Sequence, residues 1–392
     1  MFLDLTARRN PSLLEHAAWL HQQQRIPPNT YVLDADTIVH NAELLARAGH
    51  SNRVTLNVMT KQFGRNPRVS QLIEQAGLDR FVAVDVDEAR ILWRAGLHVA
   101  HVGHLVGCAA YDLREVLQHR PLAITVFDIA KADRINRVAG ELGLRQNLLL
   151  RLYEPDLSYH PCQHGGFTLG DLDAALEAMV SRANVAVTGV TTHPALEVSY
   201  DTGAGWRTPK VDLLLAGADT VRAATGAGVE INSPGVTCVA TIPLLAGEGL
   251  TTGEPGSALT GTTPLHAHSE QPEIPAVVYV SEVSHTFHER VFTFGGGFYP
   301  RGRAQGALLG RDGKLPTMRL NVVDAPPEAI DYYGELGNET DQDVRTGDTA
   351  LYAFRNQIFV TRARVAVVEG LRSSTPRVSG IYDSTGTLLA ES

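Results

Sequence analysis

Lysine is scarce in this chain, and one lysine stands where an amine could do chemistry. The 392-residue sequence has 34 basic residues, of which four are lysines: Lys61, Lys131, Lys210 and Lys314. Lys61 directly follows the apolar run VTLNVMT (54–60) and begins the polar turn KQFGRNP. An amine at the end of a buried strand loses solvation, which lowers its pKa and suits it to Schiff-base formation. A solvated loop lysine fits the same spacing equally well.

Other polar residues also close apolar runs. Glu254 stands in GEPGSALTG, where a stiff backbone holds the carboxylate and glycine lets a phosphate approach the main-chain amides. An ordinary glutamate in a Gly-rich turn is the alternative. Ser233 precedes an expected helix over 236–246 and is predicted to be its N-cap, with free amides as an anion site, although capping alone explains the pattern. The remaining residues at such ends are Asp85, His104, Asp128, Arg151 with Tyr153, His193 and Asn232.

These side chains need a scaffold that brings strand ends together. Helical spacing of apolar residues occurs in 129–142 and 211–221, between apolar runs that we interpret as buried parallel strands. Strand and helix alternate, and eight such units predict a TIM-type (β/α)8 barrel, an α/β fold whose chemistry lies at the carboxyl ends of the strands. The eight runs, of which the last is the weakest, are 54–60, 81–85, 102–105, 122–127, 147–153, 185–193, 229–232 and 251–259.

The sequence changes in character after about residue 270, where strand-like runs are separated by Gly, Pro and Asp. We therefore expect a barrel over 36–270 and a smaller, mostly β domain over 271–392. The N-terminal segment 1–35, with the strand TYVLD, is expected to pack with the β domain. Two long connections, 154–169 and 194–209, follow barrel strands and are expected to shape the site.

Composition excludes several classes of function. The 34 basic and 43 acidic residues give a net charge of -9, which offers no basic surface for nucleic acid. No apolar run reaches the about 18 residues of a membrane span, and the first residues lack a signal-peptide pattern. Cys108, Cys162 and Cys238 are too few and too scattered for a disulfide framework. We expect a cytoplasmic protein with neither nucleic acid nor membrane as partner.

Other chemistries have little support. His160, Cys162 and His164 form an H-x-C-x-H pattern, but structural zinc sites need a fourth ligand and looser spacing, so we expect no metal. The glycines at 295–297 do not complete GxGxxG, and neither a P-loop nor a G-x-S-x-G motif occurs.

Taken together, the motifs resemble a known family. The chain has a lysine after the first barrel strand, Thr-His at the end of the sixth, Asn-Ser after the seventh and Glu-Pro-Gly after the eighth. With a β domain behind them, these resemble the fold type III enzymes of the alanine racemase superfamily, which use pyridoxal 5'-phosphate (PLP). MTKQFGRNP, GEPGSALTGTTPLHA and FGGGFYPRG resemble the YhfX-like branch, described as amino-acid racemases. The resemblance covers nearly the whole chain.

The resemblance implies a role for each site residue. It makes Lys61 the residue of the internal aldimine with PLP, His193 the imidazole beside the cofactor ring, and Glu254 the partner of the pyridine nitrogen. Arg151 is expected either to steer the substrate carboxylate or to tune a neighbouring group. The other residues expected to hold the cofactor are Asn232, Ser233, Gly235, Gly256 and Ser257, with Tyr352 reaching the phosphate from the second domain.

Two departures narrow the reaction. Glu254 replaces the arginine of alanine racemase and matches the ornithine-decarboxylase-like members; a carboxylate there keeps the ring nitrogen protonated and the electron sink strong. The decarboxylases use a β-domain cysteine, and the D-serine dehydratases and D-threonine aldolases use a His-x-Cys metal pair, but no cysteine follows Cys238. We therefore expect a racemase or epimerase acting at Cα of an amino acid through a quinonoid stabilised by Glu254. Decarboxylation, elimination or another lyase reaction, or a non-catalytic PLP-binding role, are the alternatives.

Racemisation needs a proton-transfer group on each face of Cα. Lys61 would serve one face, and the superfamily supplies the other from the β domain of a partner subunit, which implies a homodimer. The matching stretch offers His285, His288 and Tyr299. We favour His285, because imidazole titrates near neutrality and it lies closest to the place of the family's tyrosine; a surface histidine is the alternative.

Overall fold

A nearly closed parallel sheet carries the strand ends. The computed structural model describes residues 1–313, 315–373 and 375–391, so Lys314 lies outside the described residues. One nine-stranded sheet has the order β2-β12-β11-β8-β7-β6-β5-β4-β3, with every pairing parallel. The bounds are β2 (Thr55–Leu56), β3 (Val58–Met59), β4 (Phe81–Ala83), β5 (Val99–Val102), β6 (Ala123–Val126), β7 (Gln146–Arg151), β8 (Val185–Thr191), β11 (Glu230–Asn232) and β12 (Thr252–Gly253).

One expected strand is split, and the split joins the two ends of this sheet. The run 54–60 forms β2, which pairs with β12, and β3, which pairs with β4, with Asn57 between them. The Asn57 amide donates to Gly253 O at 3.0 Å. The predicted TIM-type barrel is therefore confirmed, with its first strand serving both edges.

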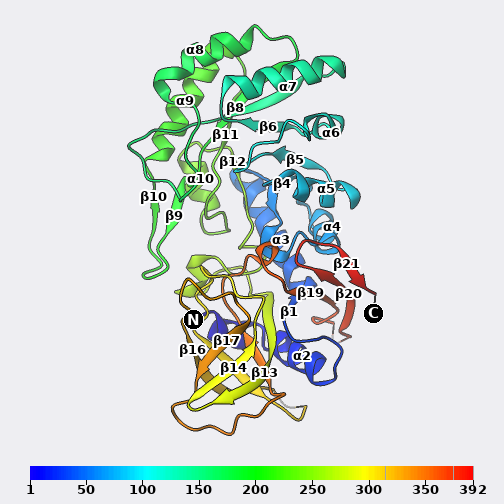
Figure 1. Cartoon of the computed structure of the whole chain (residues 1–392). Coiled ribbons are helices and arrows are strands. Elements are labelled where there is room, and N and C mark those ends of the chain that lie inside the picture. Colours follow the sequence, from blue (N-terminus) through cyan, green and yellow to red (C-terminus); the bar gives the residue numbers. More distant parts are fainter. Residues whose placement is uncertain (314, 374, 392) are drawn as a thin grey trace.

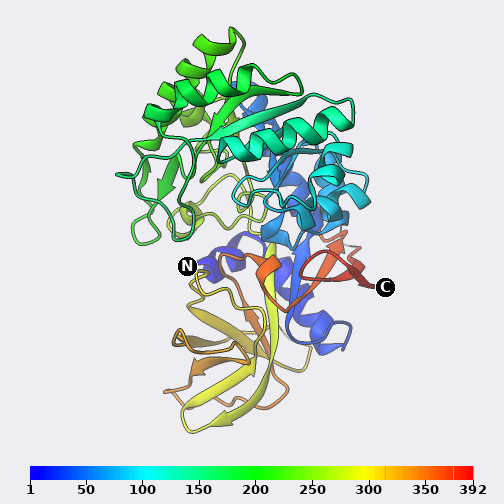
Figure 2. The same ribbon diagram turned by 45° about the horizontal axis from the view of Figure 1, so that its top comes forward.

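Helices surround the strands on the outside (Figure 2). The expected helices over 129–142 and 211–221 are present as α7 and α9, whereas the expected helix over 236–246 is wrong, since α10 begins only at Ile242. Ser233 is consequently no N-cap, and its hydroxyl instead donates to Thr252 O at 2.7 Å. The bounds are α3 (Ala35–Asn52), α4 (Pro67–Gln75), α5 (Val86–Arg94), α6 (Leu113–Gln118), α7 (Ile129–Glu141), α8 (Leu169–Val180), α9 (Lys210–Thr225) and α10 (Ile242–Gly247).

The second unit is an antiparallel β domain beneath the barrel (Figure 1). Its ten-stranded sheet has the order β14-β17-β16-β15-β18-β13-β1-β19-β20-β21, with β14 also pairing with β13. The bounds are β1 (Thr30–Asp34), β13 (Val277–Phe287), β14 (Arg290–Phe294), β15 (Gly306–Gly310), β16 (Met318–Val323), β17 (Tyr333–Gly337), β18 (Thr349–Tyr352), β19 (Arg364–Glu369), β20 (Arg377–Asp383) and β21 (Leu388–Ala390).

The N-terminal segment joins this β domain. Strand β1 lies between β13, to which it is antiparallel, and β19, to which it is parallel. Helices α1 (Phe2–Arg9) and α2 (Pro11–Gln22) share a small core with the sheet, in which Leu13 and Leu14 are buried with Val278 and Leu351. The chain therefore crosses from the β domain to the barrel at α3 and returns after β12.

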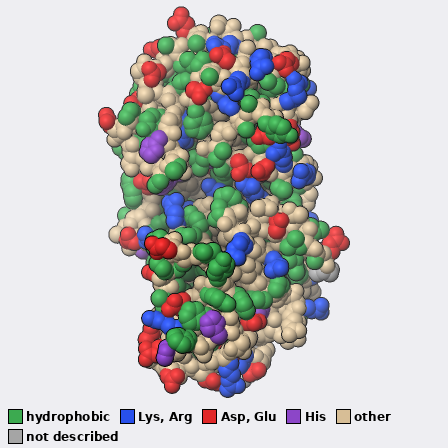
Figure 3. All heavy atoms as spheres, viewed as in Figure 1, with side chains coloured by type: hydrophobic (Ala, Val, Ile, Leu, Met, Phe, Trp, Pro, Cys, Tyr) green, Lys and Arg blue, Asp and Glu red, His purple; other side chains and the backbone are tan. Residues whose placement is uncertain are grey.

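Two surface properties bear on partners. Acidic and basic side chains are interspersed on the face shown in Figure 3. No helix in the described part of the chain has the length and apolar character needed to cross a membrane.

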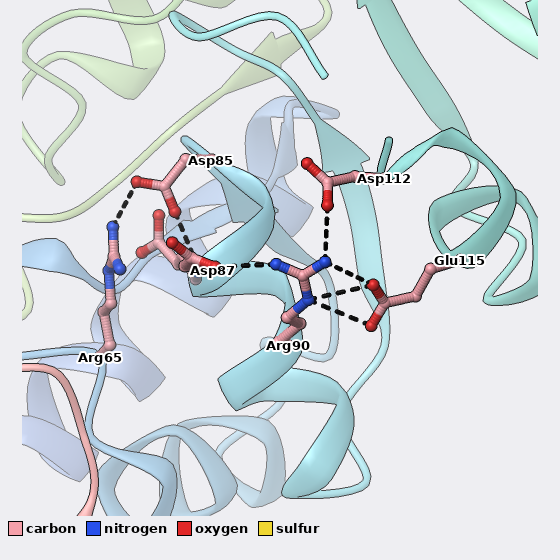
Figure 4. Close-up of polar contacts among 7 residues, drawn as sticks. Arg65, Asp85, Asp87, Arg90, Asp112 and Glu115 are labelled. Carbon is pink, nitrogen blue, oxygen red and sulfur yellow. Dashed lines mark hydrogen bonds and ion pairs between the residues drawn. The ribbon is translucent and has the colours of Figure 1, made fainter. Parts of the chain in front are cut away.

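Two of the strand-end carboxylates are structural. Asp85 accepts from the Glu88 amide at 2.8 Å as N-cap of α5, and Asp128 caps α7 in the same way. Asp85 also pairs with Arg65 at 2.6 Å, which ties the turn after Lys61 to α5 (Figure 4). The Arg65 side chain is only 7% exposed, so water screens this ion pair little. The pair therefore helps to hold the turn that positions Lys61.

Candidate active site

A cavity of about 420 Å³ lies at the carboxyl ends of the barrel strands. The barrel supplies one wall, and the β domain of the same chain supplies another, so the pocket lies between the two units. The lining residues that matter below are Lys61, Gln62, His104, His160, His193, Glu197, Tyr200, Gly235, Val236, Glu254, Gly256, Ser257, Tyr299, Arg301 and Arg355.

Lys61 opens a short 3-10 turn, η1 (Lys61–Phe63), and its side chain lines the pocket. Burial lowers the pKa of its amine; Glu88 opposes this shift and Arg355 adds to it. Among the lysines of the described residues, Lys131 donates to Cys108 O, and Lys210 lies 4.9 Å from the Tyr159 ring centroid. The structure therefore brings Lys61, and neither of these two, to the strand-end pocket.

Glu254 is the carboxylate at the floor of the pocket and is 4% exposed. Its Oε1 accepts from Asn232 Nδ2 at 2.8 Å and lies 3.2 Å from His101 Nδ1. His104 Nδ1 lies 3.0 Å from Oε2, yet the geometry makes no hydrogen bond, and Oε2 has no hydrogen-bond partner among the described residues. Burial alone would raise the pKa of the Glu254 carboxyl, but His104 and His101 hold it below its usual range.

The histidines around Glu254 form a connected group. His101 Nε2 lies 2.6 Å from Thr125 Oγ1, inside the barrel. Burial lowers the pKa of His104, and the neighbouring Glu254 opposes this shift. Together with Glu254, His101 and His104 are also spaced closely enough to hold a metal ion, a cluster that the sequence interpretation missed. His104 stood among the strand-end residues, whereas His101 was left outside because β5 begins three residues before the predicted strand.

His193 lies at the pocket wall after β8. Its Nδ1 is 3.0 Å from Gln163 Oε1, and its ring centroid is 5.8 Å from that of His104. Burial lowers the pKa of His193 well below its usual value, and the neighbouring His104 adds to the shift. The imidazole is therefore neutral at physiological pH.

Bare main chain lines another side of the pocket. The amide N–H groups of Gly235, Val236, Gly256 and Ser257 donate to no group within the described residues. A Cβ at Gly256 would lie 2.6 Å from Gln62 Cδ, and a Cβ at Gly235 would lie 2.8 Å from Leu196 O. Converging free amides beside such glycines make a cradle for a phosphate-like anion.

Five predicted site residues lie outside the pocket lining of this chain. Arg151 is buried, donates to Gln163 O at 3.0 Å and lies 5.5 Å from the Phe127 ring centroid. The Tyr352 hydroxyl lies 2.7 Å from Thr293 Oγ1 within the β domain. His285 is exposed and stacks on Phe292, with ring centroids 4.6 Å apart. Asn232 and Ser233 are placed below the lining, where they support Glu254 and β12 respectively.

The H-x-C-x-H residues separate. His160 lines the pocket, with its ring centroid 5.3 Å from that of His193. Cys162 is exposed, and His164 lies against Tyr153. The pattern does not gather these three residues as ligands within the described part of the chain.

Comparison with known proteins agrees with this architecture. Residues 33–264 match the family model described as alanine racemase, N-terminal domain, and residues 278–378 match that described as YhfX-like, C-terminal domain. The chain belongs to the alanine racemase family. Within this family it is 35% identical, over 389 residues, to the uncharacterized protein YhfX of Escherichia coli (strain K12), covering 99% of this chain and 100% of that protein. The predicted resemblance to the YhfX-like branch is confirmed.

Proteins of known structure that share this fold are named for different reactions. An alanine racemase from Clostridium difficile 630 has a TM-score of 0.60 at 13% identity and covers 92% of this chain and 99% of its own. D-threo-3-hydroxyaspartate dehydratase from Delftia sp. HT23 has a TM-score of 0.63 at 15% identity, covering 90% and 97%. D-threonine aldolase from Filomicrobium marinum has a TM-score of 0.60 at 14% identity, covering 92% and 95%. Members of the alanine racemase family use PLP, and the fold alone leaves the reaction open.

Proposed function

We propose that this protein is a PLP-dependent racemase or epimerase acting at Cα of an amino acid. The observation that carries the proposal is the convergence of three features in one pocket: the Lys61 amine, the unpartnered Oε2 of Glu254, and the free amides at 235–236 and 256–257.

The residues present fit PLP. Lys61 would hold the cofactor covalently, Glu254 would accept from its ring nitrogen, and the four amides would hold its phosphate. His193 would lie beside the ring, and Asn232 would orient Glu254. When bound, the cofactor supplies a sink for the electron pair left when a bond to Cα breaks.

The chain's own groups set the proton chemistry. Because burial lowers the pKa of Lys61, its amine gives up its own proton more readily than an exposed lysine does, and Nζ would take a proton from one face of Cα. Glu254 stays ionised through Asn232 and His101, so a protonated ring nitrogen finds a fixed negative partner. The β-domain wall closes the pocket beside Lys61, since Asn356 Nδ2 donates to Gln62 O. That closure limits the water that could compete for the proton.

The opposite face needs a second proton-transfer group. His285 is exposed in its own chain, so it could act only from a partner subunit of a homodimer, the state typical of the family. Tyr299 lines the pocket from the same chain and is the intramolecular candidate. His285→Ala and Tyr299→Phe separate the two, because the essential group is the one whose loss stops interconversion of the two enantiomers while Lys61 still exchanges the Cα proton on its own face.

Another reaction at Cα is the second candidate, because a dehydratase and an aldolase share the fold. Solvent deuterium distinguishes the outcomes. A racemase places deuterium at Cα of an otherwise unchanged amino acid, a decarboxylase places it in an amine, an eliminase or aldolase destroys the amino acid, and a PLP carrier does none of these.

The cofactor is tested first. Purified wild type, Lys61→Ala and the control Lys131→Ala are compared by absorption spectroscopy with added PLP, then reduced with borohydride and mapped by peptide mass. We expect a reduced adduct on Lys61 in wild type and in Lys131→Ala, and no adduct at position 61 in Lys61→Ala. A wild type that stays colourless with PLP would overturn the proposal.

A further inference from the structure

Two arginines face the pocket from the β domain without a compensating carboxylate. Arg355 and Arg301 line the cavity, and neither makes an ion pair or a side-chain hydrogen bond among residues 1–313, 315–373 and 375–391. Arg303, on the same segment, pairs with Asp201 at 2.6 Å. The difference indicates that the charges at 301 and 355 are left for something that enters the pocket.

Arg355 is the better placed of the two. It follows β18, and its amide donates to Gly302 O at 3.2 Å, which fixes the backbone beside the 299–302 segment. Its side chain is half-buried, and Nε is shielded from solvent with no partner. Arg301 is exposed at the rim. An unpaired donor of a charged group in a shielded position is costly unless a ligand pairs with it.

Tyr200 adds a second unpartnered donor at the same place. The Arg355 Cζ lies 5.6 Å from the Tyr200 ring centroid. The Tyr200 hydroxyl is buried, lines the pocket and has no hydrogen-bond partner in the described part of the chain. A guanidinium fork beside a hydroxyl is a donor set that matches a carboxylate.

The pocket therefore has donors for two anions. The four free amides at 235–236 and 256–257 belong to the barrel wall, whereas Arg355 belongs to the β domain and Tyr200 to the hairpin formed by β9 (Leu196–Val198) and β10 (Gly205–Arg207). If the amides hold the cofactor phosphate, as the proposed function requires, the second donor set remains for the substrate. The acidic residues of the lining do not occupy it. Glu254 Oε1 accepts from Asn232 Nδ2, and no ion pair joins Glu197 to Arg301 or Arg355 among the described residues.

We propose that Arg355 and Tyr200 bind a carboxylate of the substrate, with Arg301 attracting it at the rim. This inference rests on the proposed function for the identity of the first anion. It assigns the carboxylate-binding role to Arg355, in place of Arg151, which the structure buries against Phe127 outside the lining. It also predicts a specificity: an amine without a carboxylate binds more weakly than the matching amino acid, because it gains nothing from the guanidinium.

The first test uses the wild-type protein, loaded with PLP, and acetate as the probe. Modification of arginines by phenylglyoxal is followed by peptide mapping, with acetate compared with chloride at equal ionic strength. We expect acetate to slow modification of Arg355 several-fold and to leave Arg362 unchanged as the internal control. PLP alone should not protect Arg355. Protection by PLP alone would mean that Arg355 holds the cofactor phosphate, and absence of acetate protection would mean that it holds no carboxylate; either result overturns the proposal.

The second test uses variants. Arg355→Met should leave the PLP dissociation constant within about twofold and weaken binding of an amino acid by about 10- to 100-fold, as expected for a lost charged hydrogen bond. Binding of the matching amine should not change. Arg355→Lys should restore part of the amino-acid affinity, Tyr200→Phe should lose less than Arg355→Met, and Arg362→Met should match wild type. Equal losses for amine and amino acid would overturn the proposal.

The two proposals fail separately. If wild type never forms an adduct on Lys61, the proposed function fails, while acetate protection of Arg355 in the PLP-free protein still reports the carboxylate site. If the adduct forms and acetate does not protect, the carboxylate site alone fails.

Discussion

Replacing Glu254 with glutamine tests whether this buried carboxyl is ionised in the folded protein. Glutamine keeps the size and one oxygen, so Asn232 Nδ2 and His101 Nδ1 can still bond to the oxygen that they approach at 2.8 Å and 3.2 Å. What is lost is the charge. Hydrogen bonds to a charged group contribute about 1.5–3 kcal/mol and neutral ones about 0.5–1.5 kcal/mol, so each of the two bonds weakens by about 1 kcal/mol.

We therefore expect Glu254→Gln to lower the free energy of unfolding by about 2 kcal/mol at pH 7, seen as a drop of a few degrees in the thermal midpoint. Glu43→Gln is the control, because Glu43 is 47% exposed and lies 3.9 Å from Arg47, a weak surface pair. The assay is thermal unfolding of the PLP-free proteins, followed by circular dichroism.

The pH dependence of the free energy of unfolding tests whether Glu254 is charged in the folded protein. The folded-state pKa of Glu254 is below its unfolded value of about 4.3, so the stabilisation is complete above that pH and is lost as pH falls through the folded pKa. The difference between wild type and Glu254→Gln should be constant from pH 5 to 7 and shrink below about pH 4. An unchanged or higher midpoint for Glu254→Gln at pH 7 would refute the reasoning, because glutamine mimics a protonated carboxyl.

Three further changes test other parts of the site. Asp85→Ala removes the cap of α5 and the 2.6 Å pair with the buried Arg65, so unfolding should become easier by about 2–4 kcal/mol; a loss under about 0.5 kcal/mol in thermal unfolding would contradict the assigned roles. Gly256→Ala should weaken PLP binding at least about tenfold in an absorbance titration. Gly228→Ala is the control, because a Cβ there meets nothing within 4 Å and should leave the affinity unchanged. Equal affinities of the two variants for PLP would contradict the proposed amide cradle. His193 is neutral when folded because burial lowers its pKa, so its unfolded form takes up a proton as pH falls below about 6.5 and stability is lost. His193→Gln should reduce that loss by up to about 1.4 kcal/mol per pH unit between pH 7.5 and 5.5, and parallel pH profiles of the two midpoints would show that His193 is not the group.

The barrel and the place of Lys61 could be predicted from sequence because both depend on local signals. An apolar run that stops at a polar turn marks a strand end, and strand ends meet at one rim of a barrel. Glu254 was found by the same route. The boundaries of the elements were predicted less accurately. The last strand was expected over 251–259, but β12 is only Thr252–Gly253, since the residues after it turn across the pocket floor.

The Ser233 prediction failed for a physical reason. The Thr237 hydroxyl accepts from the Glu254 amide at 3.1 Å, and the Thr241 hydroxyl accepts from the Cys238 amide at 2.9 Å. The Thr241 hydroxyl also donates to Val236 O at 2.7 Å, so a side chain takes a carbonyl that a helix over 236–246 would use. The segment therefore supports the Glu254 loop as turns until α10 begins. Periodicity of apolar residues does not reveal such side-chain competition.

Arg355 and Tyr200 could not be found from sequence because their roles depend on distant contacts. Arg355 lies in a segment without apolar periodicity, and Tyr200 lies on a loop more than 150 residues away. Contacts of Asn356 with Gln62 and Thr262, far apart in the sequence, bring that segment to the pocket. His101 shows the opposite case: a polar residue within an apolar strand is a local signal, and a three-residue error in the strand boundary hid it.

The pocket draws Lys61 and the Glu254 carboxylate from the barrel, and its unpaired guanidinium groups from the β domain. With the proposed roles, the reacting groups are encoded in the barrel, and the charged groups that recognise the substrate are encoded in the β domain. We expect changes in the β domain to alter substrate preference while Lys61, Glu254 and the amide cradle stay as they are. Recombination at the 264–277 junction, where the barrel strands have ended and β13 has not yet begun, is the natural place to try it, with the N-terminal 1–34 exchanged together with the sheet into which β1 is inserted.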